Sequence, residues 1–330
     1  MRTTPLYPMS FEPILRQLIW GGRRLGTVLK KHLGTASDYA ESWEISDYRD
    51  AVSVVNAGPL KGTSLRELIR ERGAELLGER MSTVEQFPLL VKFIDANEVL
   101  SVQVHPNDEQ GQRLSGDGGK TEAWVVMAVQ PGGLIYAGLK EGVQRPDFEA
   151  AIKAGTVPKL LHAIEPRPGD CILIEAGTVH AIGAGVLLAE IQQTSDATYR
   201  VDDWGRTGPD GKPRALHLRE ALEVIDFDRG PVSPIIPKAE THAWGKREPL
   251  ARSEFFEFDR WSLQASTTLG REQEFTILLG LEGRSSVIHN GESHPLGFGS
   301  SMLVPASVGR FEIEPIGAST VLSCVVPRGS

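Results

Sequence analysis

The sequence contains very little cysteine. Only two of its 330 residues are cysteines, Cys171 in GDCILIEAG and Cys324 in TVLSCVVP, and neither has a CxxC partner. Isolated cysteines inside apolar runs indicate buried thiols in a reducing compartment, and they argue against disulfides and against a cysteine metal site. We therefore expect a cytoplasmic protein that folds around an apolar core.

A targeting or membrane segment is also missing from the N-terminal stretch MRTTPLYPMSFEPILRQLIWGG. Prolines and charged residues interrupt it, so it provides neither a signal-peptide core nor the roughly 20 apolar residues of a membrane span. We expect this opening stretch to be coil. The closing VPRGS is either native or the remnant of a cleavage tag, and it does not contribute to the predicted fold.

The chain has no surplus of positive charge. Its 35 Lys and Arg residues face 43 Asp and Glu, which gives a formal net charge of -8. This balance offers no general attraction to nucleic acid or to an anionic membrane. No P-loop and no GxGxxG fingerprint follows a predicted strand, which argues against a nucleotide cofactor. An anionic ligand would have to be held by a few local cations.

What the sequence does contain is a long series of short apolar runs separated by Gly, Pro, Asn and Asp. After short strands at 43–46 and 51–55, the runs are LLVKFIDA, LSVQVHP, EAWVVMAV, GLIYAGL, CILIEAG and VLLAEIQQ, then FFEFDRWSLQ, EFTILLGLEG, SSVIHNG, SSMLVPAS and TVLSCVVP. This pattern is typical of an all-β sandwich or barrel. We predict a mainly β protein.

Three stretches have helical spacing instead. Residues 64–79 place leucines and an isoleucine at helical intervals, with Thr63 or Ser64 as N-cap. Residues 146–161 and 216–225 form two further helical segments, which we expect to lie outside the sheets. The proline-rich stretch 228–249 reads as a connection. We therefore predict a domain over 1–227, a connection over 228–249 and a second domain over 250–330.

An internal repeat relates the two halves. Gly169 to His180 reads GDCILIEAGTVH, and Gly299 to Arg310 reads GSSMLVPASVGR, so that Gly, an apolar strand and Ala recur in register. Glu122 and Glu274 supply a second anchor, with an extra helical stretch in the first copy. The repeat resembles the cupin superfamily, although Glu175 stands where that motif usually has Pro. The resemblance implies two cupin-like β-barrel or jelly-roll halves with a few peripheral helices.

Metal-ligating residue types gather in the first copy only. Gln103 and His105 are two apart on a predicted strand, so both point to the face opposite Val102 and Val104. The set is completed by Glu122, which begins a strand, and His180, which closes the cupin-like motif. A borderline divalent ion such as zinc needs three or four such N and O donors. In the second copy the His position is Arg310, which cannot bind a metal.

The motifs together resemble a family, the type I mannose-6-phosphate isomerases in their short bacterial form. The matching motifs, in family order, are FxPxLxxxxWGG (Phe11 to Gly22), ESWEIS (Glu41 to Ser46), LLVKFIDANEVLSVQVHPND (Leu89 to Asp108), GKTEAW (Gly119 to Trp124), PGDCILIEAGTVHAIG (Pro168 to Gly183) and IQQTSDATYRVDDWGR (Ile191 to Arg206). They cover most of the first 206 residues. The resemblance implies an enzyme that interconverts mannose 6-phosphate and fructose 6-phosphate through an enediol, with one zinc ion per chain.

Carried over residue by residue, the resemblance implies that His105, Glu122 and His180 are zinc ligands, with Gln103 as a weaker fourth. Arg200 matches the family's catalytic arginine, and Lys120 matches a lysine of the same pocket. Ser101 faces that pocket too, where it is either a substrate contact or an ordinary strand serine. The proton-transferring base stays open, and its candidates are Glu190, Asp196, Lys120 and a water on the metal.

Other conspicuous residues have plainer interpretations. We expect four tryptophans to be core residues, with sugar stacking as the alternative, and five histidines to be structural or exposed. These residues are Trp20, Trp43, Trp124 and Trp204, and His162, His217, His242, His289 and His294. The basic turn Gly21-Gly22-Arg23-Arg24 either is solvated or places cations near a phosphate.

Two other functions remain possible at this point. One is a non-catalytic sugar-phosphate-binding cupin, although the joint presence of His105, Glu122, His180 and Arg200 speaks against it. The other is a metal-dependent cupin dioxygenase, for which Gln103 in place of a histidine is unfavourable. For partners we expect a small sugar phosphate, no nucleic acid and no membrane, and a monomer or weak homodimer.

Overall fold

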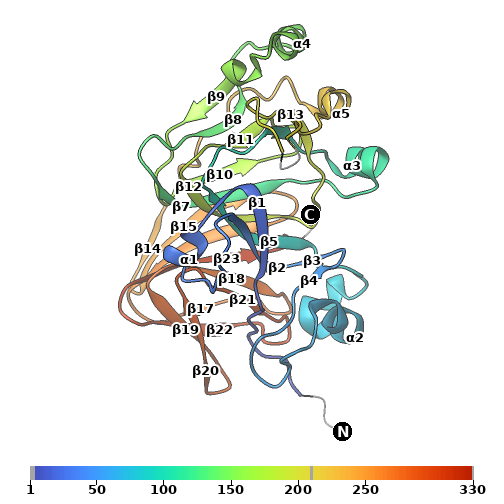
Figure 1. The fold of residues 1–330 in the computed structure, drawn as a ribbon. Coiled ribbons are helices and arrows are strands. Elements are labelled where there is room, and N and C mark those ends of the chain that lie inside the picture. The colour runs from blue at the N-terminus through green and yellow to red at the C-terminus, as the bar shows by residue number, and fades with distance from the viewer. Residues whose placement is uncertain (1–3, 209–210, 329–330) are drawn as a thin grey trace.

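The apolar runs pair into four principal sheets in the computed structural model, which describes residues 4–208 and 211–328 (Figure 1). The last two residues of VPRGS, Gly329 and Ser330, lie outside the described residues, as does the start of the chain before residue 4. A small fifth sheet pairs β3 (Asp47–Tyr48) with β4 (Ala51–Val52). The prediction of a mainly β protein is confirmed.

The first half of the chain forms two antiparallel sheets. In spatial order, the six-stranded sheet contains β1 (Ile14–Gly22), β2 (Tyr39–Ile45), β5 (Leu89–Ala96), β12 (Val186–Gln193), β7 (Glu122–Val129) and β10 (Cys171–Ile174). The five-stranded sheet contains β13 (Tyr199–Asp202), β6 (Val102–Val104), β11 (His180–Ile182), β8 (Ile135–Leu139) and β9 (Leu161–Ile164). The opening stretch is thus not coil throughout, because β1 extends the larger sheet.

The second half forms a matching pair of sheets. Its six-stranded sheet contains β14 (Glu240–His242), β15 (Gly245–Arg252), β16 (Glu257–Leu263), β23 (Ser319–Val325), β18 (Thr276–Glu282) and β21 (Ser301–Val304). Its four-stranded sheet contains β17 (Thr267–Leu269), β22 (Phe311–Pro315), β19 (Arg284–His289) and β20 (Glu292–Gly297). No closed barrel is found among the described strands, since each sheet keeps two unjoined edges.

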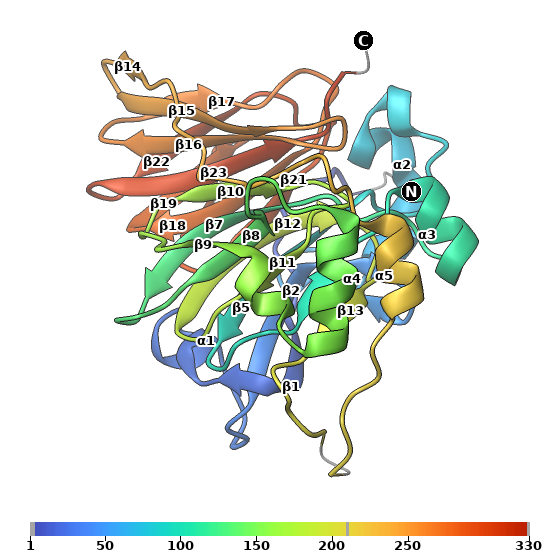
Figure 2. The same ribbon diagram turned by 90° about the horizontal axis from the view of Figure 1, so that it is seen from above.

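The two six-stranded sheets pack face to face, with β10 in contact with β15 and β2 in contact with β21. Figure 2 shows the orange and red strands of the second half stacked on the green strands of the first. Strand alternation sends Val91 and Phe93 of β5 into this shared core, where they join Phe258 and Ile277 of the second half. The same alternation turns Lys92 of β5 to the opposite face, toward the five-stranded sheet. One apolar core therefore joins the two halves.

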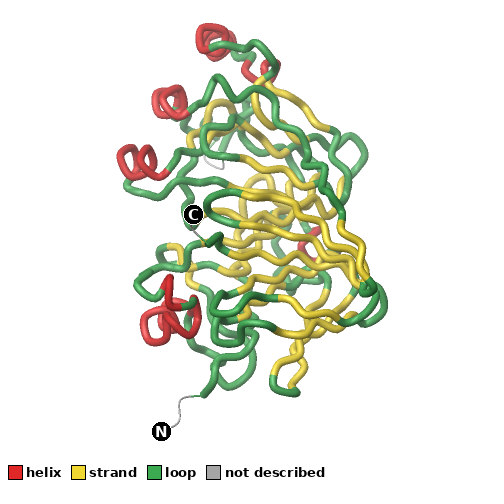
Figure 3. Tube along the Cα trace, turned by 180° about the vertical axis from the view of Figure 1, so that it is seen from behind, coloured by secondary structure: helices red, strands yellow, loops and turns green. Residues whose placement is uncertain are grey.

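Most of the helical segments lie along one side of this stack (Figure 3). Helix α2 (Leu65–Leu77) begins at Ser64 with a capping box to Glu67, which confirms the predicted cap. Helices α4 (Arg145–Ala154) and α5 (Leu218–Val224) cover the outer face of the five-stranded sheet. The remaining short helices are α1 (Arg24–Thr27), η1 (Glu79–Met81), α3 (Asp108–Ser115) and η2 (Val157–Leu160). No described helix is long and apolar enough to span a membrane.

The sheet register corrects one anchor of the internal repeat. Ile174 of β10 pairs with Glu122, and its counterpart Val304 of β21 pairs with Thr276. The repeat therefore aligns Glu122 with Thr276, two residues beyond the predicted Glu274. A shift of two keeps the same face of the strand, so the second half has a threonine where the first has a carboxylate.

Both cysteines are buried and unpaired, as predicted. Burial raises the pKa of Cys171 to about 12 and also raises the pKa of Cys324. Neither thiol ionises at neutral pH, so both serve as apolar core residues.

The shared core predicts that damage to one half destabilises the whole chain. Phe275 of the second half is 2% exposed, and its ring lies 5.2 Å from that of Phe87 in the first half. Replacing Phe275 with alanine should lower the free energy of unfolding by about 3–5 kcal/mol, measured by chemical denaturation as one transition. The control Ile316→Ala, at a residue 58% exposed, should cost about 0.5 kcal/mol or less. Two separate transitions, with only one of them shifted, would contradict the shared core.

Candidate active site

The site lies between the two sheets of the first half, and strand register aims its side chains. Gln103 of β6 pairs directly with His180 of β11 on one side and with Arg200 of β13 on the other. Directly opposed residues on antiparallel strands project from the same face, so these three side chains share one surface. Val102 and Val104 pack on the opposite face beneath α4 and α5, which confirms the predicted alternation.

Three ionisable side chains converge there as a group that could hold a metal ion. Ligand atoms of His105, Glu122 and His180 all lie within 4.8 Å of one another, and all three residues are buried. The Glu122 carboxylate is 3.6 Å from His105 Nε2 and 3.4 Å from His180 Nε2. Glu122 enters from β7 on the facing sheet, so the cluster bridges the two sheets.

Hydrogen bonds fix which nitrogen each imidazole offers. His105 Nδ1 lies 2.8 Å from the carbonyl oxygen of Ala197, and His180 Nδ1 lies 2.9 Å from that of Thr178. A carbonyl only accepts, so each Nδ1 carries the proton and each Nε2 keeps its lone pair. This arrangement orients metal-binding histidines in proteins generally.

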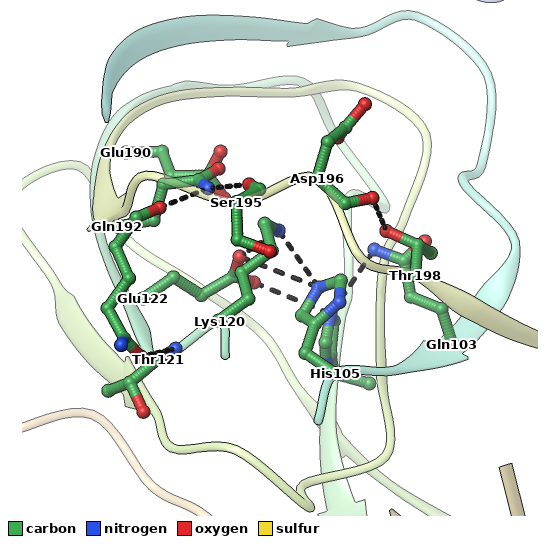
Figure 4. Close-up of polar contacts among 12 residues, drawn as sticks. Gln103, His105, Lys120, Thr121, Glu122, Glu190, Gln192, Ser195, Asp196 and Thr198 are labelled. Atoms are coloured by element: carbon green, nitrogen blue, oxygen red, sulfur yellow. Dashed lines mark hydrogen bonds and ion pairs between the residues drawn. The ribbon is translucent and has the colours of Figure 1, made fainter. Parts of the chain in front are cut away.

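The other predicted pocket residues surround this cluster (Figure 4). Lys120 Nζ donates to His105 Nε2 at 2.9 Å and also contacts the Glu122 carboxylate. Gln103 presents its amide nitrogen to His180 Nε2 at 3.3 Å, while Ser101 Oγ lies 3.4 Å from the Gln103 amide oxygen. For Gln103 to bind a metal through oxygen, its amide would have to turn over.

A set of buried, charged side chains next to this cluster, centred on Lys92, was not predicted. Lys92 Nζ lies 3.5 Å from Glu190 and 3.8 Å from Glu41, and it sits 4.9 Å from the centre of the Trp43 ring. The indole nitrogen of Trp124 donates to Glu190 at 2.9 Å. The available signal was the lysine in the middle of the strand LLVKFI, whose other residues are all apolar, because a lysine buried in a strand requires a charged partner.

Burial and neighbouring charge together set the protonation of the site. Burial lowers the pKa of His180 to about 4, and burial and the Lys120 cation lower the pKa of His105 well below its ordinary range. Burial and Glu190 raise the pKa of Glu122. Burial acts the same way on Glu190, but Lys120 and Lys92 outweigh it and lower that pKa. Both imidazoles are therefore neutral at pH 7 and can act as ligands.

A cavity of about 280 Å³ opens onto this network. Glu122, Gln103 and Lys120 line it, together with Ser101 and Arg200. The candidate bases Glu190 and Asp196 line it as well, Glu190 buried and Asp196 exposed. The cavity thus combines possible metal ligands, proton acceptors and cations, which suits an anionic substrate with several hydroxyl groups.

The tryptophans and the basic turn have mainly structural contacts. Trp43 and Trp124 are fully buried, Trp20 and Trp124 line the cavity, and the indole nitrogen of Trp204 donates to the Leu100 carbonyl. In the basic turn, Arg24 binds Asp95 and three backbone carbonyls, and Arg23 donates to two carbonyls. Neither arginine is among the described residues that line the cavity.

The second half lacks an equivalent cluster. Its Arg310 side chain is 69% exposed and lies 4.0 Å from Glu272, pointing to solvent. Within residues 4–208 and 211–328, the structure contains a single group of His, Cys, Asp or Glu side chains that could hold a metal, and it is the one described above.

Comparisons with known proteins agree with this geometry. The model of the type I phosphomannose isomerase catalytic domain matches residues 9–122, and that of the mannose-6-phosphate isomerase cupin domain matches residues 247–324. Mannose-6-phosphate isomerase ManA of Bacillus subtilis is 34% identical over 95% of this chain and 97% of its own length. The mannose-6-phosphate isomerase of Streptococcus mutans is 33% identical over 93% and 95%. A crystal structure of the Bacillus subtilis mannose 6-phosphate isomerase superposes with a TM-score of 0.88 at 29% identity, covering 97% of this chain and 99% of that one.

The buried pair Lys92 and Glu190 predicts a specific pattern of stabilities. Lys92→Met leaves a buried carboxylate without its counter-charge and should lower the free energy of unfolding by about 3–5 kcal/mol. Adding Glu190→Gln should restore about 1–3 kcal/mol of that loss, measured by urea denaturation of both single variants and the double variant.

The matched control is the exposed pair Arg145 and Glu149, where Arg145→Met should cost about 1 kcal/mol or less. A double variant as unstable as the sum of its two single variants would show that the pair is not coupled.

Proposed function

This chain belongs to the type I mannose-6-phosphate isomerase family, and from that premise we propose that it interconverts mannose 6-phosphate and fructose 6-phosphate at a zinc ion held by His105, Glu122 and His180. The observation that carries the proposal is the convergence of two unprotonated Nε2 atoms on the Glu122 carboxylate, which lines a cavity together with Arg200. The isomerase activity itself follows from the family membership.

The donor set fits a borderline divalent ion. Two imidazole nitrogens and one carboxylate oxygen, with the cavity on the open side, are the ligand types and number that a catalytic zinc site uses. Lys120 Nζ contacts two of the same donor groups, so that a cation already complements them, and a metal would displace this ammonium toward the cavity. When bound, zinc would act as a Lewis acid toward the sugar oxygens. Gln103 is the proposed weaker fourth ligand.

The reaction moves a proton between neighbouring carbons of the open-chain sugar through an enediol. Arg200, which stays protonated in its cavity, stabilises the negative charge that develops on the substrate oxygens. Lys120 and Ser101 hold substrate hydroxyls. Glu190, which Lys92 and Lys120 keep ionised, and Asp196 both line the cavity as candidate proton acceptors, and the choice of base stays open among the predicted candidates.

The remaining assignments follow the same proposal. We infer that residues 1–227 form the catalytic cupin-like domain and that 250–330 belong to a second cupin-like domain without a metal. The connection predicted over 228–249 is shorter in this proposal, because β14 and β15 already join the second half's six-stranded sheet from Glu240 onward. The cupin-domain match at 247–324 and the outward Arg310 support this division. The near-full coverage of the relatives supports the short form of the enzyme. We also propose a cytoplasmic monomer or weak homodimer without a nucleic-acid partner, which agrees with the net charge of -8.

Zinc dependence has a direct test. Formation of fructose 6-phosphate from mannose 6-phosphate, followed in a coupled assay, should disappear after chelation and return when zinc is added. His180→Ala removes a ligand, and it should lose both bound zinc and at least about 10²-fold in kcat/KM. His242→Ala, at an exposed histidine of the second half, should keep both. Full activity in the chelated protein would refute the metal site.

The role of Arg200 has its own test. Arg200→Met should lower kcat/KM by about 10²–10³-fold, because it removes a preorganised cation from the site of developing charge. Zinc content should stay unchanged. Arg310→Met, the equivalent change at an exposed arginine, should have no measurable effect. A zinc-loaded Arg200→Met enzyme with normal kinetics would show that this arginine is not catalytic.

A further inference from the structure

We propose that Arg214, held in place by Asp203 and lying beside Arg200, binds the phosphate group of the substrate at the outer part of the cavity. The proposal rests on the proposed function, because it assumes a sugar phosphate whose reacting carbons lie at the metal ligands. Arg214 lies outside all the motifs that carry the family resemblance, since it follows the last of them in the loop between β13 and α5.

Strand register places Arg200 and Arg214 at the end of the cavity away from the metal ligands. His180, Gln103 and Arg200 are direct neighbours across three strands, so Arg200 lies two strand spacings, or about 10 Å, from the histidine. Arg200 Nη1 donates to the carbonyl of Ala215 at 3.0 Å, which ties it to the segment that carries Arg214. A substrate that reaches from the metal ligands past Arg200 therefore meets Arg214, which also lines the cavity.

The Arg214 side chain is oriented for recognition. Its Nε and Nη2 both donate to the Asp203 carboxylate, with Nε at 2.7 Å. Asp203 also accepts from Arg206 Nη2 at 2.5 Å and is itself buried. This two-point contact fixes the plane of the Arg214 guanidinium, and its Nη1 has no partner among the described residues. A planar, oriented guanidinium is well suited to phosphate oxygens.

The local charge favours an anion. The guanidinium groups of Arg206 and Arg214 share the single carboxylate of Asp203, and Arg200 lies beside them. The Nε of Arg200 is buried and has no hydrogen-bond partner within the described part of the chain. Burial, followed by the proximity of Arg214, lowers the pKa of Arg200. A phosphate dianion between Arg200 and Arg214 would offset the repulsion between these two cations.

The other cations near the cavity are already neutralised. Lys120 contacts Glu122, and Lys92 lies between Glu190 and Glu41. Among the described residues that line the cavity, Arg200 makes no ion pair, and Arg214 shares its one carboxylate partner, Asp203, with Arg206.

The test compares steady-state kinetics of the zinc-loaded wild type with those of Arg214→Met and Arg214→Lys. Loss of a charge-assisted hydrogen bond should raise KM for mannose 6-phosphate about 10–100-fold in Arg214→Met, while kcat changes about threefold or less. The inhibition constant of inorganic phosphate should rise by a similar factor. Arg214→Lys keeps the charge but loses the planar fork, so its KM should fall in between.

Several results would overturn the proposal. They are an unchanged KM in Arg214→Met, an unchanged inhibition constant for phosphate, or a loss confined to kcat. Arg310→Met is the control for removal of an exposed arginine. If Arg214→Met fails to fold, a normal KM in the zinc-loaded Arg214→Lys variant refutes the proposal instead. If the wild type does not turn over mannose 6-phosphate, the proposed function fails, and calorimetric titration of both proteins with inorganic phosphate still tests this site.

Discussion

The structure of the first half depends on burying the Glu122 carboxylate between two neutral imidazoles and an ammonium group. A buried charge is costly unless it is paired and hydrogen-bonded, and each charged group here has partners from a different strand. Lys120 compensates Glu122, Lys92 compensates Glu190, and backbone carbonyls hold the two Nδ1 atoms. The sheets must therefore keep their register, because a slip of one residue would turn these side chains into the apolar core.

The face-to-face arrangement of the six-stranded sheets supplies the rigidity that this network needs. Lys92 points into the site while its neighbours Val91 and Phe93 pack against the second half. The second half keeps the sheet order but lacks two of the metal-ligand types, since Thr276 stands in place of the Glu122 carboxylate and Arg310, in place of His180, points to solvent. On this account, the second half supports the first mechanically, and its surface is free of the constraint to hold a metal.

Much of the fold and site could be predicted from the sequence, for identifiable reasons. The strands β5, β7 and β12 are long, mostly apolar runs between turn residues, so their bounds were correct, and the Ser64 cap marks the start of α2. Gln103 and His105 follow from a period of two along one strand. The partners of Lys92 could not be predicted, because Glu190 and Glu41 reach it only through strand pairing between distant segments. Helix α3 was missed because its polar residues show no apolar stripe. The repeat anchor was wrong because Glu274 lies two residues before Thr276, the residue that the sheet register aligns with Glu122.

The central claim is that one zinc ion binds between His105, Glu122 and His180, and a crystal of the zinc-loaded protein tests it most directly. Diffraction data collected on both sides of the zinc absorption edge give an anomalous difference map that locates the ion without reference to activity. The account predicts a single strong peak per chain, within bonding distance of both Nε2 atoms and the Glu122 carboxylate, with Lys120 moved aside. A peak in the second half would contradict it, and so would fully active protein whose crystals show no peak in this cluster.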